Sequence, residues 1–108
     1  MIYELRRYEV APGRMNELHE RFEKHTLRLF EKFGIKPVAF WTSLVGEDPN
    51  CLTYLLQFES LEAQKHAWDL FMKDEERIAI WNKSNENGKL VVNIVSKTLA
   101  PTEYSPLQ

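Results

Sequence analysis

The sequence is poor in the residues that staple small domains or bind metals. Its 108 residues include one cysteine, three histidines, four glycines and five prolines. The lone Cys51 excludes an internal disulfide, and its place in an apolar stretch favours a buried side chain over a reactive thiol. The histidines form no i, i+4 pair, so we expect neither a zinc site nor a haem ligand set. We therefore predict that the chain uses no metal and no other cofactor.

Long apolar runs and a charge imbalance are also absent. No apolar run approaches the roughly 20 residues of a membrane span. The net charge of −2 arises from 14 basic and 16 acidic residues that are interspersed, without the basic stripe that attracts nucleic acid. The first residues enter strand alternation directly and lack the apolar core of a signal peptide. We predict one domain over residues 1–108, cytoplasmic, with no membrane span and no nucleic-acid partner.

What the sequence does contain is a regular order of strand and helix patterns. Ser60 and Asp74 are placed as N-caps, and Gly34 is placed to end the first helix. The pattern predicts strands at 2–10, 37–45, 51–59 and 89–99, and helices at 15–33, 61–73 and 75–82. The turn between the two central strands is expected at 46–50. This order predicts an α+β, ferredoxin-like βαββαβ fold with an antiparallel four-stranded sheet and its helices on one face.

The strands carry apolar residues on both faces. In the third strand Leu52, Tyr54, Leu56 and Phe58 alternate with Cys51, Thr53 and Leu55. Alternating residues point to opposite sides of a sheet, so both sides are expected to be buried. Two helices cover only one side, and a bare apolar face is unusual on a monomer. We therefore expect a homodimer that forms through the sheet face away from the helices.

Several short motifs, in order, resemble the NIPSNAP family over nearly the whole chain. They are Ile2-Tyr3-Glu4-Leu5-Arg6, Pro12-Gly13, Phe30-Glu31-Lys32-Phe33-Gly34, Phe40-Trp41-Thr42, Asp74-Glu75 and Pro101-Thr102-Glu103-Tyr104-Ser105-Pro106. Many relatives have glycine where this chain has Ala39. The resemblance implies a dimeric α+β barrel. That superfamily includes cofactor-free monooxygenases, muconolactone-type isomerases and haem-handling enzymes, so the likeness selects no single function.

The candidate site residues are aromatic, with one histidine. Trp41, Tyr54, Trp68 and Trp81 suit a pocket for a small aromatic or apolar molecule between sheet and helices, although they also suit a filled core. His25, at the edge of the first helix's apolar stripe, is the candidate catalytic base. We predict that His25, Trp41, Tyr54 and Trp68 surround one pocket, with Trp81 closing the same space, which requires Trp41 and Tyr54 to share a sheet face. The alternatives are a cofactor-free monooxygenase or isomerase that uses His25, and a protein-interaction scaffold. Whether the chain is an enzyme stays open.

Overall fold

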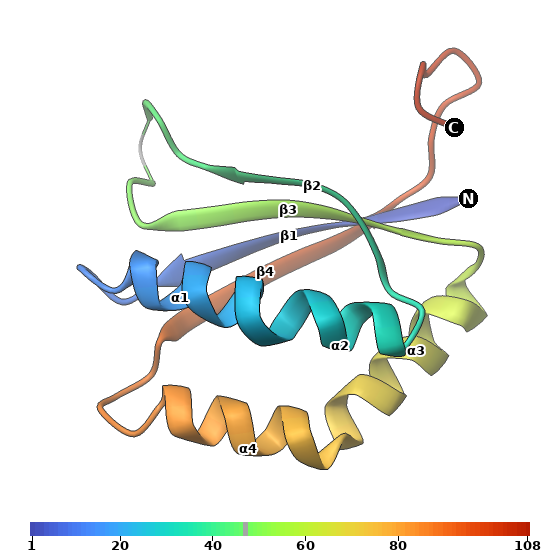
Figure 1. The fold of residues 1–108 in the computed structure, drawn as a ribbon. Coiled ribbons are helices and arrows are strands. Elements are labelled where there is room, and N and C mark those ends of the chain that lie inside the picture. The colour runs from blue at the N-terminus through green and yellow to red at the C-terminus, as the bar shows by residue number, and fades with distance from the viewer. Residues whose placement is uncertain (47) are drawn as a thin grey trace.

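The computed structural model describes residues 1–46 and 48–108 and has the predicted α+β, ferredoxin-like fold. Its elements are β1 (Ile2–Val10), α1 (Met15–Arg21), η1 (Phe22–Thr26), α2 (Leu27–Lys32), β2 (Lys36–Thr42), β3 (Cys51–Phe58), α3 (Leu61–Lys73), α4 (Glu75–Ser84) and β4 (Val91–Leu99). The strands form one antiparallel sheet in the order β2-β3-β1-β4. All helices lie on one side of this sheet (Figure 1).

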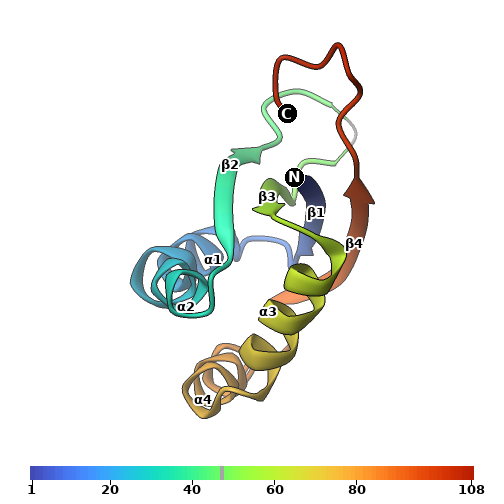
Figure 2. The same cartoon turned by 90° about the vertical axis from the view of Figure 1, so that its right-hand side faces the viewer.

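The first helical segment is continuous from Met15 to Lys32 but contains a wide π-turn, η1, in its middle. The hydroxyl of Thr26 donates to the carbonyl of Arg21, five residues earlier, at 3.3 Å. Such turns insert one extra residue into an α-helix and are frequent at functional sites. In Figure 2 this segment lies beneath the sheet on the side of β2, and α3 lies toward β4.

The second helical region breaks where the sequence predicts. The side chains of Ser60 and Asp74 each accept a hydrogen bond from the backbone N–H three residues later, at 3.1 and 2.9 Å. Both predicted N-caps are confirmed. Leu61 and Met72 are exposed, because α3 buries only a narrow stripe around Ala67 and Phe71. No residue of α4 is fully buried.

The strand register sets which side chains face the helices. Tyr54 pairs with Arg6 on one side and with Phe40 on the other, and these side chains point toward the helices. The core beneath the sheet is Tyr8, Val10, Leu18, Phe22, Leu29, Phe30, Ile35, Leu52, Tyr54, Leu56, Phe58, Ala67, Phe71 and Leu90. The predicted bounds of β2 were too long, since residues 43–45 continue no strand. Of the predicted turn at 46–50, Glu47 lies outside the described residues.

The other sheet face carries no helix in either view (Figures 1 and 2). Leu5 and Leu55 pair with each other at its centre. Trp41, Val95 and Leu99 lie on the same face and are 52%, 43% and 40% exposed. The C-terminal tail reaches one end of this face, where the hydroxyl of Tyr3 donates to the carbonyl of Gln108 at 2.6 Å. An apolar surface is therefore left uncovered on this side of the chain.

Candidate functional site

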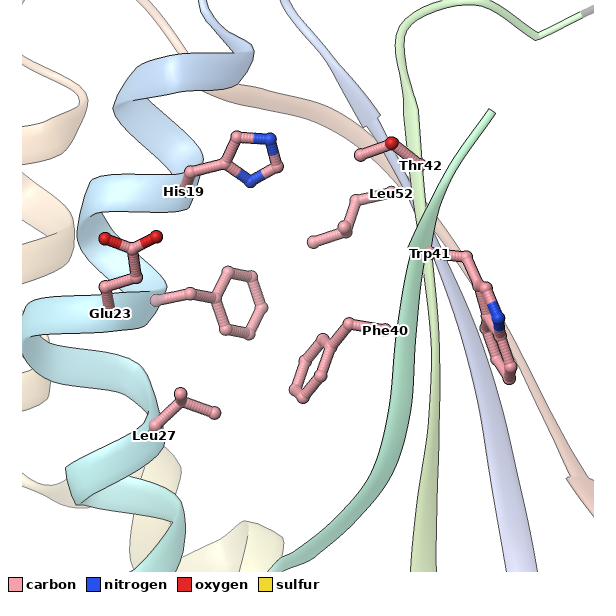
Figure 3. Close-up of a pocket in the computed structure, with 8 residues that line it drawn as sticks. His19, Glu23, Leu27, Phe40, Trp41, Thr42 and Leu52 are labelled. Carbon is pink, nitrogen blue, oxygen red and sulfur yellow. The ribbon is translucent and has the colours of Figure 1, made fainter. Parts of the chain in front are cut away.

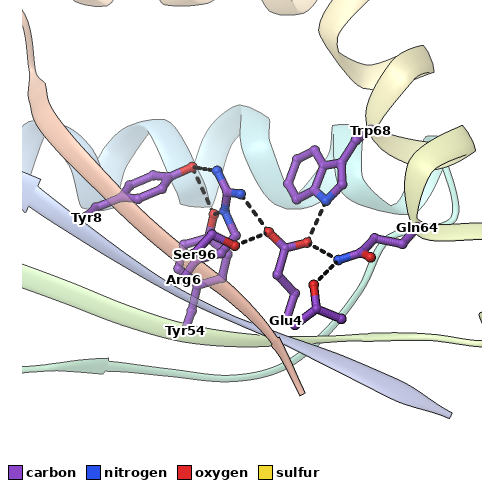
Figure 4. Close-up of polar contacts among 8 residues, drawn as sticks. Glu4, Arg6, Tyr8, Tyr54, Gln64, Trp68 and Ser96 are labelled. Atoms are coloured by element: carbon purple, nitrogen blue, oxygen red, sulfur yellow. Dashed lines mark hydrogen bonds and ion pairs between the residues drawn. The ribbon is translucent and has the colours of Figure 1, made fainter. Parts of the chain in front are cut away.

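A buried carboxylate lies on the helix side of β1. Glu4 is only 4% exposed and accepts four hydrogen bonds, from the indole N–H of Trp68 (2.7 Å), the amide of Gln64 (2.8 Å), the hydroxyl of Ser96 (2.6 Å) and the guanidinium of Arg6 (2.8 Å) (Figure 4). Burial alone would raise the pKa of Glu4, but these hydrogen bonds outweigh it and hold the pKa below its ordinary value. Glu4 is therefore an ionised anchor between β1, β4 and α3.

Arg6 extends this network into the core. Its Nε atom donates to the hydroxyl of Tyr54 at 2.7 Å, and Tyr54 donates to the hydroxyl of Tyr8 at 2.8 Å. The guanidinium also lies 4.5 Å from the centre of the Trp68 ring, a cation–π contact. Burial raises the pKa of Tyr54 well above its ordinary value, so this phenol stays protonated. The charge of Arg6 is thus matched by Glu4, and its position is fixed by two phenols.

Two adjoining cavities lie beside this network, with volumes of about 290 and 130 Å³. Arg6, Tyr8, Trp68, Phe71, Met72, Arg77, Trp81 and Ile94 line the larger, and Tyr8, Arg21, Arg77, Trp81, Asn85, Val91 and Ile94 line the smaller. Four residues are common to both, so the two cavities form one cleft between β1 and β4 above and α3 and α4 below. We call it the aromatic cleft.

Two guanidinium groups in the aromatic cleft have no acidic partner among the described residues. Arg21 and Arg77 stack on the ring of Trp81, with guanidinium carbons 4.1 and 5.0 Å from its centre. Arg21 is 5% exposed, and the Nε atoms of both arginines are buried without a hydrogen-bond partner in the described part of the chain. Burial lowers the pKa of Arg21, and the nearby charge of Arg77 acts in the same direction. The cleft therefore has a cationic end.

A third cavity, of about 340 Å³, lies between the first helical segment and β2. His19, Phe22, Glu23, Leu27, Phe40, Trp41, Thr42 and Leu52 line it. In Figure 3 the ring of Phe40 points into this cavity, whereas the indole of Trp41 points to the opposite side of β2. Trp41 pairs with Thr53 and not with Tyr54, after an irregularity in the register between Pro37 and Ala39. The prediction that Trp41 and Tyr54 share a sheet face is wrong.

His25 lies in a fourth cavity of about 380 Å³, between the first helical segment and α4. Its neighbours there include Glu20, Lys24 and Lys83, and its buried Nδ1 atom has no hydrogen-bond partner among residues 1–46 and 48–108. The prediction that His25, Trp41, Tyr54 and Trp68 surround one pocket is therefore wrong, because the helix turns His25 toward α4 while Trp41 lies on the bare sheet face. Catalysis by His25 stays a prediction.

The structure does bring other candidates together. Trp68 and Trp81 line the aromatic cleft, and Tyr54 lies directly behind it in the network of Arg6. Sequence reasoning missed Glu4 and Arg6. Both follow the two-residue spacing of Tyr8 and Val10 and so share the helix-facing side of β1 with them. Two charged residues at buried strand positions are the signal that would have identified the network. Arg21 and Arg77 gave no comparable signal, since their burial depends on how the helices pack.

Over residues 1–46 and 48–108, no three His, Cys, Asp or Glu side chains are grouped as metal ligands would be. In the same ranges, no helix has the length and hydrophobicity needed to cross a membrane.

Solved structures of similar fold cover nearly the whole chain. A NIPSNAP family protein from Agrobacterium tumefaciens has 18% identity and a TM-score of 0.88, over 99% of this chain and 98% of that one. A NIPSNAP-like domain protein from Burkholderia xenovorans has 22% identity and a TM-score of 0.84, over 97% of this chain and 88% of that one. A mutant of MhuD with two manganese protoporphyrin IX molecules per active site is more distant, with 16% identity and a TM-score of 0.62 over 94% of each chain.

These structural likenesses lie below 25% identity and show the shared fold alone. No curated protein matches the chain. The sequence pattern of the NIPSNAP family matches residues 3–106, which includes every strand except the first residue of β1 and every helix described above. The chain therefore belongs to the NIPSNAP family.

Proposed function

We propose that this protein binds a small, flat aromatic molecule in the aromatic cleft. The observation that carries the proposal is the gathering of Tyr8, Trp68, Phe71 and Trp81 around one cavity. Aromatic rings provide a large apolar contact area and favour stacked or edge-to-face contacts with a planar ligand. The cavity volume of about 290 Å³ is close to the lower end of the range for small-molecule sites. A ligand of one or two fused rings fits this size.

The walls of the cleft are held in place before a ligand arrives. Phe71 makes edge-to-face contacts with Trp68 and Trp81, with ring centres 5.3 and 5.7 Å apart. The indole N–H of Trp68 is also fixed by its hydrogen bond to Glu4. Side chains that are already ordered lose little freedom on binding, which favours affinity. A protein of similar fold, MhuD, holds a flat tetrapyrrole in its active site, and this lends support to a planar ligand here.

Tryptophan replacement tests the proposal, with a matched control in the same chain. We expect Trp81→Leu to weaken binding of naphthamide, an uncharged planar probe, by about tenfold or more, because an aromatic side chain that lines the cleft is lost. Trp41→Leu should leave the affinity unchanged, since Trp41 points to the other side of the sheet. Isothermal titration calorimetry measures both. If the two variants bind the probe equally well, the aromatic cleft is not the site.

We further propose that a second copy of the chain covers the bare sheet face. This face places Leu5, Leu55, Val95, Leu99 and Trp41 together without a helix above them. Exposed apolar side chains gathered on one sheet face favour association, and burying their surface contributes roughly 25 cal/mol per Å² before the costs of association. The proposed assembly leaves the aromatic cleft on the outer, helical side of each subunit.

A charge at the centre of this face tests the assembly. We expect Leu55→Glu to dissociate the dimer or to unfold the chain, because a carboxylate would lie against the apolar face of the second copy. Leu61→Glu is the control, since Leu61 is exposed on the helical side. Light scattering with a circular dichroism spectrum separates dissociation from unfolding. A wild-type monomer at micromolar concentration, or a Leu55→Glu dimer as stable as the control, would contradict the proposal.

A further inference from the structure

The cationic end of the aromatic cleft is an unusual feature for a pocket that binds only apolar molecules. Of the three arginines that line the cleft, Arg6 has its ion pair with Glu4 at 2.8 Å. Arg21 and Arg77 have no ion pair among the described residues, and no described residue that lines either cavity is acidic. Buried charges are normally paired or coordinated. Two neighbouring guanidinium groups without a counter-charge therefore indicate an anion that the protein itself does not provide.

We propose that the ligand of the aromatic cleft is a planar aromatic carboxylate, with its carboxylate held by Arg21 and Arg77 and its ring among Tyr8, Trp68 and Trp81. This assignment rests on the proposed binding of a flat aromatic molecule and adds its chemical class. Arginine is the residue best suited to carboxylates, because its planar set of N–H donors matches both oxygens. The ring and the charge are then recognised at opposite ends of one cleft.

Size and neighbours favour a carboxylate over a larger anion. The cationic end is the smaller cavity, of about 130 Å³, and apart from Arg21, Arg77 and the amide of Asn85 its lining is aromatic or aliphatic. A carboxylate is compact, carries one charge and lies in the plane of an attached ring. A phosphate ester carries more charge and three oxygens around a tetrahedral centre, and would leave acceptors facing Val91 and Ile94. The cavity thus offers few donors and little room beyond those a carboxylate uses.

The test compares naphthoate with naphthamide, which share one ring system and differ in charge. We expect wild-type protein to bind naphthoate at least about tenfold more tightly than naphthamide, measured by calorimetry at low salt. Arg77→Gln should reduce the naphthoate-to-naphthamide affinity ratio from at least about tenfold to near one, because the charge that distinguishes the two probes is lost. Arg28→Gln is the matched control, because Arg28 is exposed and paired with Glu76 at 2.9 Å, and it should keep the wild-type preference.

The possible results separate the two proposals. If wild-type protein binds neither probe, the proposed function fails and this inference fails with it. If both probes bind with equal affinity, the aromatic site stands and the carboxylate assignment is overturned. Naphthyl phosphate bound more tightly than naphthoate would also overturn it, in favour of a phosphate ester. Chemical-shift changes in the indole N–H signal of Trp81, absent for Trp41, would show that naphthoate occupies this cleft, and the reverse pattern would refute it.

Discussion

Glu4→Gln is expected to lower the free energy of unfolding by about 2–4 kcal/mol. The carboxylate accepts four hydrogen bonds, and an amide retains only one acceptor oxygen. Two donors would face the new NH2 group, and Arg6, whose side chain is largely buried, would lose its counter-charge. Urea denaturation followed by circular dichroism measures the change.

Asp69→Asn is the control for this substitution, because it removes an exposed carboxylate that is paired with Lys65. It should leave the midpoint of urea denaturation almost unchanged. Acid titration provides a second readout. The folded pKa of Glu4 lies below its ordinary value of 4.5, so its stabilising contribution is present above that pH and is lost as the pH falls through the folded pKa. Wild-type protein should therefore lose stability below about pH 4.5 more steeply than Glu4→Gln. If the stability of the two proteins falls in parallel as the pH is lowered, Glu4 is not held as an ionised group.

Arg21→Met is expected to have the opposite effect and raise the free energy of unfolding by about 1–3 kcal/mol. Methionine keeps much of the apolar stem that packs on Trp81, while the buried charge and its repulsion with Arg77 are removed. The gain in stability should be accompanied by loss of the preference for naphthoate. A functional site that is costly to the folded state is a common compromise between stability and activity.

Thermal and urea denaturation with and without naphthoate test this expectation. Naphthoate should stabilise wild-type protein more than it stabilises Arg21→Met, because a ligand stabilises the folded state in proportion to how tightly it binds. Arg28→Met, at an exposed position, is the control for the change of side chain. If Arg21→Met is less stable than this control, the guanidinium of Arg21 stabilises the folded chain and is not an unpaired cost.

The fold was predictable from sequence because its signals are local. The alternation of Leu52, Tyr54, Leu56 and Phe58 gave the helix-facing side of β3, and the capping residues Ser60 and Asp74 gave the starts of α3 and α4. These features depend on residues within a few positions of one another, so propensity and spacing are enough to find them.

The site was less predictable because it depends on register and packing. A single irregularity between Pro37 and Ala39 sets the face of Trp41, and strand periodicity cannot reveal it. The direction of His25 and the burial of Arg21 depend on how α4 packs against the first helical segment, which local sequence does not specify. Glu4 and Arg6 are the exception, since charged residues on a helix-facing strand position were visible as a local conflict.

The weak anchoring of α4 has a consequence for how the cleft is entered. This helix has no fully buried residue, and its contacts include the partly buried Ile80 and Trp81, the surface ion pair between Glu76 and Arg28, and a hydrogen bond from Arg14 to the carbonyl of Ser84 at 3.1 Å. Exposed ion pairs add little stability and partly buried side chains add less than fully buried ones, so we expect α4 to open locally more readily than the sheet. A ligand held between Tyr8 of β1 and Arg77 of α4 would add non-covalent contacts between this helix and the sheet. Filling the cleft should therefore stabilise α4 against local opening.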